Sequence, residues 1–298
     1  MYDIVVIGGG PAGLTAALYA ARAGKSVMIL EANAFGGQIA NAPRVENFPS
    51  VNEIAGAELA NRMFEQTVSH GVEFDMGSGV IAKTSNGFCV TTEYGSYDCH
   101  AVVVACGVSH KKLGVAGEDK QGVCYCAVCD GAFYKDKSVC VVGDGNSAAQ
   151  YALYLAEMCS EVQLLTMFNR LFCDKELIDR IESNDKIVWT KNVTVTEILG
   201  DDKVEGVVYR DSDGAITYAD TEAVFVAIGQ EPHNGQFANL VKLDDKGYVV
   251  AGEDCKTSCE GIFVAGDCRT KSVRQCATAV SDGAIAGFNA AMYVDRIK

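Results

Sequence analysis

The chain of 298 residues lacks a long apolar segment. None of its apolar runs reaches the roughly 18 residues that a membrane-spanning helix requires. It also lacks the charged and apolar regions of a signal peptide, because residues 2–7 already read as a first strand. We therefore expect no association with a membrane and a soluble, intracellular, cytoplasmic protein.

Basic residues are in deficit. Lys and Arg number 25 against 39 Asp and Glu, so the formal net charge is −14. Nucleic acid is bound by a concentrated basic face, which this balance does not favour. The sequence therefore predicts no nucleic-acid partner, and the acidic excess is typical of colloidal solubility.

Proline is also scarce, with 4 residues against 31 Gly, and 49% of the chain is hydrophobic. This is an ordinary composition for a compact α/β enzyme. The length predicts about two domains.

The 13 cysteines do not resemble a disulfide framework, because such frameworks belong to small secreted domains. Most are scattered in apolar or strand-like surroundings, where we interpret them as small core hydrophobes in a reducing cell. They are Cys89, Cys99, Cys106, Cys140, Cys159, Cys173, Cys268 and Cys276.

One structural unit occurs twice in the sequence. Residues 3–31 read as a strand, a Gly-rich turn, an Ala-rich helix over 14–23 and a second strand over 26–30 that leads to Glu31. Residues 138–166 repeat this order, with a helix over 148–158 and a strand over 161–165 that leads to Thr166. A Gly-rich turn between strand and helix, with an acid about 20 residues on, is typical of dinucleotide-binding folds. We expect an α/β protein with two Rossmann-like domains.

Each half also has a late apolar strand that ends in Gly, at 102–107 and at 224–229. Near the C-terminus, Phe263-Val264-Ala265-Gly266-Asp267 resembles the second FAD motif of flavoproteins with two dinucleotide domains, in which the Asp binds the ribitol. The resemblance implies a discontinuous FAD domain of residues 1–113 plus 231–298. A middle domain of residues 114–230 would be inserted into it through the polar, turn-rich stretches 111–121 and 230–235.

The first Gly-rich turn, residues 8–13, suits a pyrophosphate. Its glycines allow a tight turn and a close approach of the backbone, and a helix beginning near Ala12 would point its N-terminal N–H groups at the phosphates. Glu31 can accept from a ribose 2′-hydroxyl and would repel a 2′-phosphate. The motif therefore predicts an unphosphorylated adenosine, that of FAD or NAD.

Accessory segments favour FAD. Gly36-Gly37-Gln38, the stretch Glu46-Asn47-Phe48-Pro49, Ala105-Cys106-Gly107 and residues 274–279 resemble the flavin-facing segments of low-molecular-weight bacterial thioredoxin reductases, over essentially the whole chain. That resemblance implies a homodimer with one FAD per subunit. The candidate FAD-binding residues are Gly8, Gly10, Pro11, Ala12, Gly13, Glu31, Gly36, Gly37, Gln38, Asn47, Ala105, Gly107, Gly266, Asp267, Arg274, Gln275, Cys276 and Ala277.

A Cys-x-x-Cys pair, Cys126 and Cys129, precedes the second Gly-rich turn. Its spacing lets two thiols reach each other and lowers the pKa of the attacking one. Cys124 adds a third thiol, so a metal site and inert thiols are the alternatives to a redox disulfide. Zinc usually takes two such pairs, and the only other close pair is Cys255-x-x-x-Cys259. We favour the redox disulfide and predict no metal.

By the same resemblance, Cys129 would exchange electrons with the flavin and Cys126 would attack the disulfide of thioredoxin. Asp130 would protonate a departing thiolate, although Cys-Asp-Gly is also an ordinary turn sequence. The two linkers would act as hinges for the domain rotation known in that family.

The second Gly-rich turn lacks the residues for a nicotinamide cofactor. Thr166 replaces the ribose-binding acid, and family members that use NADPH carry His-Arg-Arg-x-x-x-Arg here, where this chain has apolar residues at all three arginine positions, Met167, Phe168 and Phe172. Arg170 lies two or three places away from these arginine positions. It is either a partial substitute for the missing arginines or an ordinary solvated side chain.

The ferredoxin-dependent flavin thioredoxin reductases of clostridia keep this architecture, and the chain resembles them. Ferredoxin is therefore the expected electron donor. Because ferredoxins are typically acidic, docking would need a local basic patch. Residues 269–274, with Arg269, Lys271 and Arg274, and residues 110–112 are candidates; scattered cations are the alternative reading.

The sequence thus predicts an FAD-dependent disulfide reductase that reduces thioredoxin through a Cys-x-x-Cys dithiol, with electrons from ferredoxin. The alternatives are an NADPH- or NADH-dependent enzyme with an atypical nucleotide site, a flavin dithiol oxidase, and a metal- or flavin-bound redox sensor.

Overall fold

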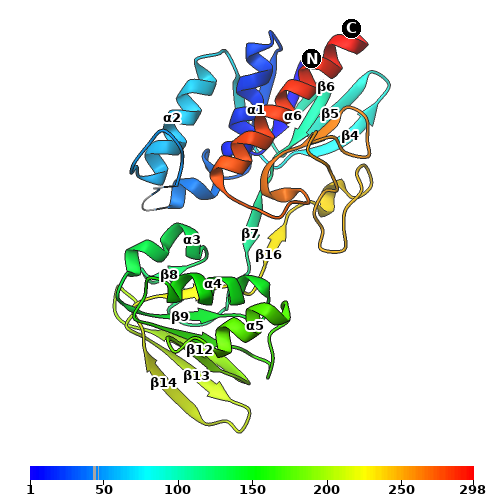
Figure 1. Cartoon of the computed structure of the whole chain (residues 1–298). Helices are drawn as coiled ribbons and strands as arrows, with labels where there is room; N and C mark the ends of the chain where they lie inside the picture. Colours follow the sequence, from blue (N-terminus) through cyan, green and yellow to red (C-terminus); the bar gives the residue numbers. More distant parts are fainter. Residues whose placement is uncertain (43–44, 46) are drawn as a thin grey trace. The chain divides into compact units, whose positions relative to one another are not determined.

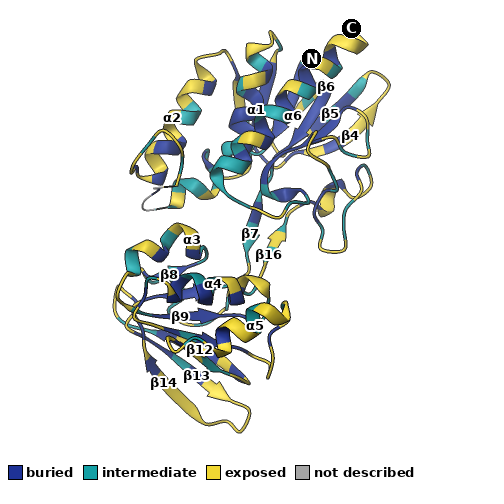
Figure 2. Cartoon of the chain, viewed as in Figure 1, coloured by how far each residue is buried: buried dark blue, intermediate teal, exposed yellow. Residues whose placement is uncertain are grey.

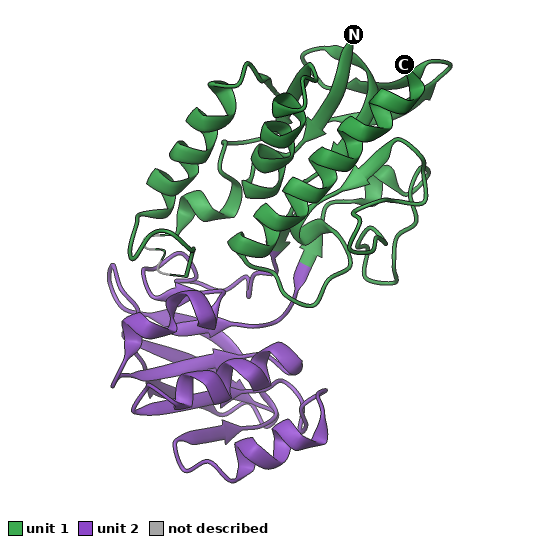
Figure 3. Cartoon of the chain, turned by 45° about the horizontal axis from the view of Figure 1, so that its top comes forward, with its two compact units in different colours: residues 1–109, 231–298 green, residues 110–230 purple. Residues whose placement is uncertain are grey.

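The structure is a computed structural model that describes residues 1–42, 45 and 47–298. It divides the chain into two compact units, residues 1–109 with 231–298 (unit 1) and residues 110–230 (unit 2), coloured separately in Figure 3. The crossing segments β7 (Val108–His110) and β16 (Gln230–Pro232) pair as a two-stranded sheet. The first crossing lies a few residues before the expected boundary at 113, and the α/β fold with one unit inserted into the other is confirmed.

Unit 1 is built on a sheet in the order β3-β2-β1-β6-β5-β4, with β17 also paired to β6. Strands β4, β5 and β6 of this sheet are labelled in Figure 1. The strands β1, β2, β3, β6 and β17 run parallel, and β4 and β5 extend the sheet antiparallel from β6. The strand bounds are β1 (Tyr2–Ile7), β2 (Val27–Glu31), β3 (Glu73–Met76), β4 (Val80–Thr84), β5 (Gly87–Thr91), β6 (Ser96–Val104) and β17 (Ile262–Val264).

Two Ala-rich helices pack on one face of this sheet, α1 (Pro11–Arg22) and α6 (Cys276–Ile297). Small side chains such as Ala16 and Ala290 let them lie close together over Val6 and Val103. The remaining helices of unit 1 are α2 (Gly56–Val68) and the short 3₁₀ turns η1 (Gly37–Asn41), η3 (Gly235–Phe237) and η4 (Gly266–Cys268).

Unit 2 repeats the parallel arrangement in the order β11-β10-β9-β15-β8 and adds an antiparallel sheet, β12-β13-β14. The strands are β8 (Val123–Cys124), β9 (Ser138–Val142), β10 (Glu161–Leu165), β11 (Ile187–Thr190), β12 (Val193–Leu199), β13 (Gly206–Asp211), β14 (Ile216–Asp220) and β15 (Val224–Val226). The helices are α3 (Ala127–Asp130), η2 (Gly131–Tyr134), α4 (Asn146–Ala156) and α5 (Lys175–Glu182). Figure 2 shows the buried central strands of each unit.

Burial separates the scattered cysteines into two groups. Cys99, Cys140, Cys159 and Cys268 are buried, as expected for small core residues, whereas Cys89, Cys106, Cys173 and Cys276 are partly exposed. In the part of the chain that the structure describes, no helix has the length and apolar character to cross a membrane.

Candidate cofactor and disulfide sites

The carboxyl ends of three parallel strands of unit 1 meet at one edge. The N–H of Ala105, just after β6, donates to the carbonyl oxygen of Ile7 at 2.7 Å, and the N–H of Ala265, just after β17, donates to that of Val104 at 2.9 Å. The Gly-rich turn after β1 therefore lies beside residues 105–107 and beside Gly266 and Asp267. Such an edge is where doubly wound folds bind ligands.

Glu31, at the end of β2, is anchored to this turn. Its Oε2 accepts from the N–H of Gly9 at 2.6 Å, and its Oε1 accepts from the N–H of Asn33 at 2.9 Å. Each oxygen retains lone pairs for a ribose hydroxyl.

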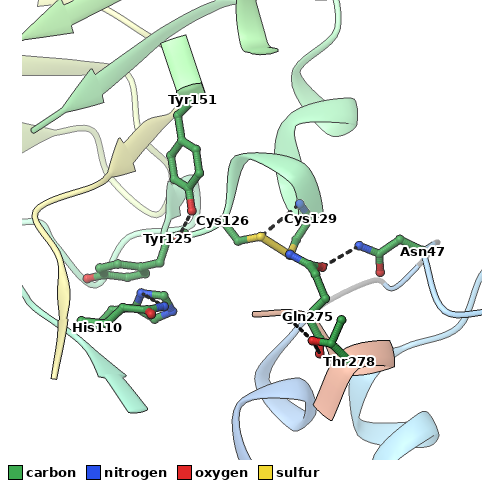
Figure 4. Close-up of a disulfide and its surroundings, with 9 residues drawn as sticks. Asn47, His110, Tyr125, Cys126, Cys129, Tyr151, Gln275 and Thr278 are labelled. Atoms are coloured by element: carbon green, nitrogen blue, oxygen red, sulfur yellow. Dashed lines mark hydrogen bonds between the residues drawn. A yellow bond between two sulfur atoms is a disulfide. The ribbon is translucent and has the colours of Figure 1, made fainter. Parts of the chain in front are cut away.

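The expected accessory segments also come to this edge. The N–H of Gly36 donates to the carbonyl of Gly9 at 2.8 Å, and the side-chain amide of Gln38 donates to the carbonyl of Val108. The Nδ2 of Asn47 donates to Oε1 of Gln275 at 3.2 Å (Figure 4). Glu46 lies outside the described residues.

Helix α6 begins at the same place. Gln275 is its N-cap and forms a capping box with Thr278, so Cys276 and Ala277 are the first helical residues. Arg274 donates through Nε to the carbonyl of Asp267 at 3.2 Å and stacks on the ring of Tyr248.

Two features of this edge are compatible with a bound external ligand. At Gly10 the backbone has an ordinary φ of −79°, and an added β-carbon would approach no protein atom closer than 3.8 Å, so neither strain nor packing requires glycine there. The buried Oδ1 of Asp267 finds no hydrogen-bond partner among the described residues. A buried polar atom of this kind calls for an external partner.

In unit 2, Cys126 and Cys129 form a disulfide across the first turn of α3, with their Cα atoms 5.3 Å apart (Figure 4). Cys126 is the N-cap of this helix, and its Sγ accepts from the N–H of Cys129 at 3.2 Å. Cys129 is exposed and Cys126 is half-buried. No group of three or more His, Cys, Asp or Glu side chains within the described residues is close enough to hold a metal ion.

Two ionisable groups adjoin the disulfide. Burial raises the pKa of Asp130 from 3.8 to about 6. Burial, and then the charge of Asp130, raises the pKa of the Cys124 thiol to about 12. Cys124 also donates to the Tyr134 hydroxyl at 3.9 Å and to the carbonyl of Gly122 at 3.7 Å. Cys124 is therefore a protonated thiol at neutral pH. The pKa of Asp130, in contrast, lies near neutral pH.

The second Gly-rich turn, residues 143–148, keeps its glycines for two different reasons. Gly143 has φ +150°, and a β-carbon there would lie 2.4 Å from the carbonyl oxygen of Ala227, so the strand–turn packing itself requires glycine. Gly145 has φ −104°, and a β-carbon there would meet no atom within 4 Å. Packing explains Gly143 and does not explain Gly145.

Thr166, at the position equivalent to Glu31, is fully buried and used internally. Its hydroxyl donates to the carbonyl of Phe168 at 2.9 Å and accepts from the indole N–H of Trp189 at 3.0 Å. Met167, Phe168 and Phe172 are 57%, 49% and 50% exposed. The loop after β10 therefore presents apolar side chains to solvent beside the turn.

The comparisons with known proteins agree with this geometry. Residues 2–283 match the family model described as pyridine nucleotide-disulphide oxidoreductase. The chain is 39% identical to the thioredoxin reductase of Listeria monocytogenes serovar 1/2a over 100% of its own length and 95% of the relative. It is also 39% identical to that of Bacillus subtilis (strain 168) over 100% and 96% of the two chains.

Among solved structures, the thioredoxin reductase of Streptococcus pyogenes MGAS5005 superposes with a TM-score of 0.94 at 41% identity, covering 99% of each chain. The chain belongs to the thioredoxin reductase family. Thioredoxin reductases of this type are FAD-binding flavoproteins, so the chain is a flavin oxidoreductase and its cofactor is FAD. The room at Gly10 and the unpartnered Oδ1 of Asp267 fit that cofactor.

Of the two readings left open for residues 269–274, the structure does not support a basic surface patch. Arg269 and Lys271 do not form a basic surface patch, because their side chains are only 5% and 8% exposed and both pair with the buried carboxylate of Asp282. Arg274 is engaged by Asp267 and Tyr248. In the second candidate stretch, His110 stacks on Tyr125 with ring centroids 5.0 Å apart, whereas Lys111 and Lys112 are exposed. The sequence gives no signal for the role of Asp282. It lies inside the helix α6, and only the folded structure brings it to Arg269 and Lys271.

Proposed function

We propose that this thioredoxin reductase reduces the disulfide of thioredoxin through Cys126 and Cys129, with electrons that reach its FAD from reduced ferredoxin. The observation that carries the choice of donor is the buried, internally bonded Thr166 beside an exposed apolar loop. The substrate is inferred from the named relatives and the exposed disulfide.

At this edge of unit 1, different residues would contact different parts of FAD. The turn over residues 8–13 would face the pyrophosphate, Glu31 the adenosine ribose and Asp267 the ribityl chain. The remaining candidates would line the flavin side; they are Gly36, Gly37, Gln38, Asn47, Ala105, Gly107, Gly266, Arg274, Gln275, Cys276 and Ala277. Bound FAD supplies chemistry that the side chains lack, since it accepts electrons singly and delivers them as a pair.

The dithiol chemistry of Cys126 and Cys129 balances with two electrons that reduced FAD would supply. Two electrons and two protons break the S–S bond of Cys126 and Cys129 and leave two thiols. The Cys126 thiolate then attacks one sulfur of the substrate disulfide, whose S–S bond breaks to give a mixed disulfide and a substrate thiolate. Cys129 attacks the Cys126 sulfur, re-forms the enzyme disulfide and releases reduced thioredoxin.

Asp130 would supply the proton to the departing thiolate. A general acid works best when its pKa lies near the operating pH, and burial has moved the pKa of Asp130 to about 6. Burial holds Cys124 as a protonated thiol, so we assign it no step in this exchange.

The loop after β10 argues against NADPH. A 2′-phosphate needs cations, and the exposed residues at the three arginine positions are Met167, Phe168 and Phe172. Hydrogen bonds to charged groups contribute roughly 1.5–3 kcal/mol each. Without two of them, affinity falls by about 10² to 10⁴. Arg170 lies over the Phe172 ring, with its guanidinium carbon 4.7 Å from the centroid.

The energetics permit ferredoxin. Plant-type ferredoxins lie near about −400 mV and thioredoxin near about −270 mV. The drop of about 130 mV is worth roughly 6 kcal/mol for two electrons.

A second candidate function, NADPH- or NADH-dependent reduction through an atypical site, is favoured by one observation. Gly145 is glycine although neither its backbone angle nor its neighbours require it. A β-carbon at Gly145 would lie in open space, and one at Gly10 in unit 1 would approach no protein atom closer than 3.8 Å.

The protein is further proposed to be a cytoplasmic homodimer. The exposed side chains of Phe288 and Met292 lie one helical turn apart on α6, which suits a second copy. The cysteines outside the disulfide are free thiols, as a reducing compartment allows.

The deciding experiment follows the flavin absorbance band anaerobically after adding NADPH, NADH or enzymatically reduced ferredoxin, each alone. Fast bleaching by ferredoxin with little from either nucleotide supports the proposal. Fast bleaching by a nucleotide overturns the choice of donor and supports the second candidate.

A further inference from the structure

The most heavily charged buried cluster of the described chain lies beside the Gly266–Asp267 motif. Asp282, on α6, is 7% exposed and faces Arg269, which is 4% exposed. The Oδ1 of Asp282 accepts from Nη1 of Arg269 at 3.0 Å, and its Oδ2 accepts from Nζ of Lys271 at 2.8 Å. One carboxylate therefore binds two cations away from solvent.

The same carboxylate makes a third contact that an ion pair does not require. The Oδ2 of Asp282 also accepts from the backbone N–H of Gly266 at 3.1 Å. Gly266 has φ +80°, a left-handed conformation, and a β-carbon there would lie 2.8 Å from the side chain of Ala12 at the start of α1. Asp282 thus fixes the peptide group that directly precedes this conformation.

Arg269 fixes the backbone on the other side of the turn that contains Asp267. Its Nη2 donates to the carbonyl of Gly252 at 2.7 Å, and its own N–H donates to the carbonyl of Gly266 at 3.3 Å. Asp267 lies between these anchored points, with its Oδ1 buried and without a partner among the described residues.

The charges also fit this arrangement. Asp267 and Asp282 carry two negative charges, and Arg269 and Lys271 carry two positive charges. Burial raises the pKa of Asp267, and the charge of Asp282 adds to this, whereas the charges of Lys271 and Arg274 lower it. Lys271, which Asp282 holds in place, therefore helps to keep Asp267 ionised, so that it can accept hydrogen bonds.

We infer that Asp282 is a positioning residue for FAD: from helix α6 it sets the direction of the Asp267 carboxylate toward the ribityl chain and holds Lys271 near it. The inference rests on the proposed contact between Asp267 and the ribityl chain. It assigns a cofactor-binding role to a residue that lies outside the Gly266–Asp267 motif.

The test measures the dissociation constants of FAD and of ADP with the full-length chain freed of FAD. ADP shares the adenosine and the diphosphate with FAD but has no ribityl chain. The Asp282→Asn variant is expected to bind FAD about tenfold or more weakly, as for one lost hydrogen bond to a charged group. Its affinity for ADP should change by less than about twofold on the same scale.

Two further variants serve as controls. Asp267→Asn removes the proposed direct contact with the ribityl chain. It should weaken the binding of FAD and leave the binding of ADP unchanged. Asp295→Asn, on the same helix, removes a surface ion pair with Lys25 and should change neither constant. An Asp282→Asn variant that loses FAD and ADP equally, or that keeps wild-type affinity for FAD, overturns the inference. An Asp267→Asn variant with unchanged FAD affinity refutes instead the proposed ribityl contact.

Should Asp282→Asn fail to fold, Lys271→Met gives the same test with only one donor removed. It is expected to weaken FAD severalfold and to leave ADP unchanged, and equal loss of both ligands again counts against the inference. Where both variants fold, their effects on FAD should be less than additive, because they share one contact.

Discussion

The Oδ1 of Asp144 accepts a hydrogen bond from the backbone N–H of Phe168 at 3.0 Å. The carbonyl of the same Asp144 accepts from the N–H of Phe172 at 2.6 Å, and the two phenyl rings meet edge to face with centroids 5.3 Å apart. The loop after β10 is thus tied to the Gly-rich turn at two points. Its exposed apolar side chains stand at the three positions where, by the family resemblance, an NADPH site would carry arginines.

This geometry predicts that nucleotide use can be introduced. In the triple variant Met167→Arg, Phe168→Arg and Phe172→Arg, all three changed side chains are exposed, so folding should be preserved. NADPH should then bleach the flavin at concentrations about 10²-fold lower or more than in the parent chain, since several charged hydrogen bonds are gained. Anaerobic stopped-flow absorbance gives the comparison.

The matched control places Gln at the same three positions, which supplies donors without charge. It should respond to NADPH much less than the arginine variant. If the arginine variant shows no gain over the control, the loop is not the determinant of the donor.

The two Gly-rich turns give a paired test. Gly10→Ala adds a β-carbon to open space at an ordinary backbone angle, so the free energy of unfolding of the FAD-free chain should hardly change. FAD binding should weaken by about tenfold or more, because the methyl group occupies the approach of the pyrophosphate. Fluorescence titration of the FAD-free chain measures this.

Gly145→Ala makes the same change in unit 2. If ferredoxin is the donor, this variant should keep its FAD affinity and its rate of reduction by ferredoxin. A loss of nucleotide-driven bleaching in Gly145→Ala would instead show that the second turn still binds a diphosphate.

The roles of the two cysteines can be separated by trapping. Thioredoxin that keeps only its attacking cysteine, activated as an aromatic mixed disulfide, is offered to each pre-reduced variant. Cys129→Ser retains the attacking Cys126 and should form a covalent adduct with thioredoxin, whereas Cys126→Ser should not. Non-reducing electrophoresis and mass spectrometry give the readout, and the reverse pattern would exchange the two roles.

Asp130 predicts a pH dependence with a definite sign. Its pKa is raised by burial from 3.8 to about 6, so the folded state binds the proton more tightly than the unfolded chain. Its contribution to stability is therefore fully present below about pH 4 and is lost as the pH rises through about 6. Relative to the Asp130→Asn variant, the free energy of unfolding of the wild-type chain should fall by up to about 3 kcal/mol over that pH interval.

Urea unfolding of both chains from pH 4 to pH 7.5 checks this prediction. Asp213→Asn, an exposed position in the same unit, serves as the control and should follow the wild type. A constant difference between wild type and Asp130→Asn across the range would mean that the carboxyl is not desolvated. If the turnover rate of the wild type changes with pH around 6, that change should be absent in Asp130→Asn.

The proposed dimer predicts a change of mass. Met292→Glu places a charge in the exposed apolar surface of α6 and should shift the chain toward the monomer in sedimentation velocity runs. Ile216→Glu, which charges an exposed apolar side chain on β14 of unit 2, should not. Equal behaviour of both variants would place the contact elsewhere.

The structure agrees with the sequence mainly where a local pattern is enough. Strands β9 and β10 have the expected bounds, 138–142 and 161–165, and both Gly-rich turns lie between strand and helix. Helices α1 and α4 begin earlier than expected because Gly10 and Gly145 act as their N-caps. The antiparallel strands β4, β5 and β12 to β14 were not foreseen, because their pairing depends on the surrounding sheet.

The sequence by itself determined the repeated strand–turn–helix units, the disulfide pair and the Gly266–Asp267 motif, because each is a short pattern whose backbone geometry is set by neighbouring residues. Only the tertiary structure decided which charges are buried. Arg269 and Lys271 read as a basic stretch, yet both fold back to bind Asp282, which lies 13 and 11 residues further along the chain in α6. The raised pKa of Asp130 and the internal bonds of Thr166 arose in the same way, since desolvation depends on which distant segments pack over a side chain.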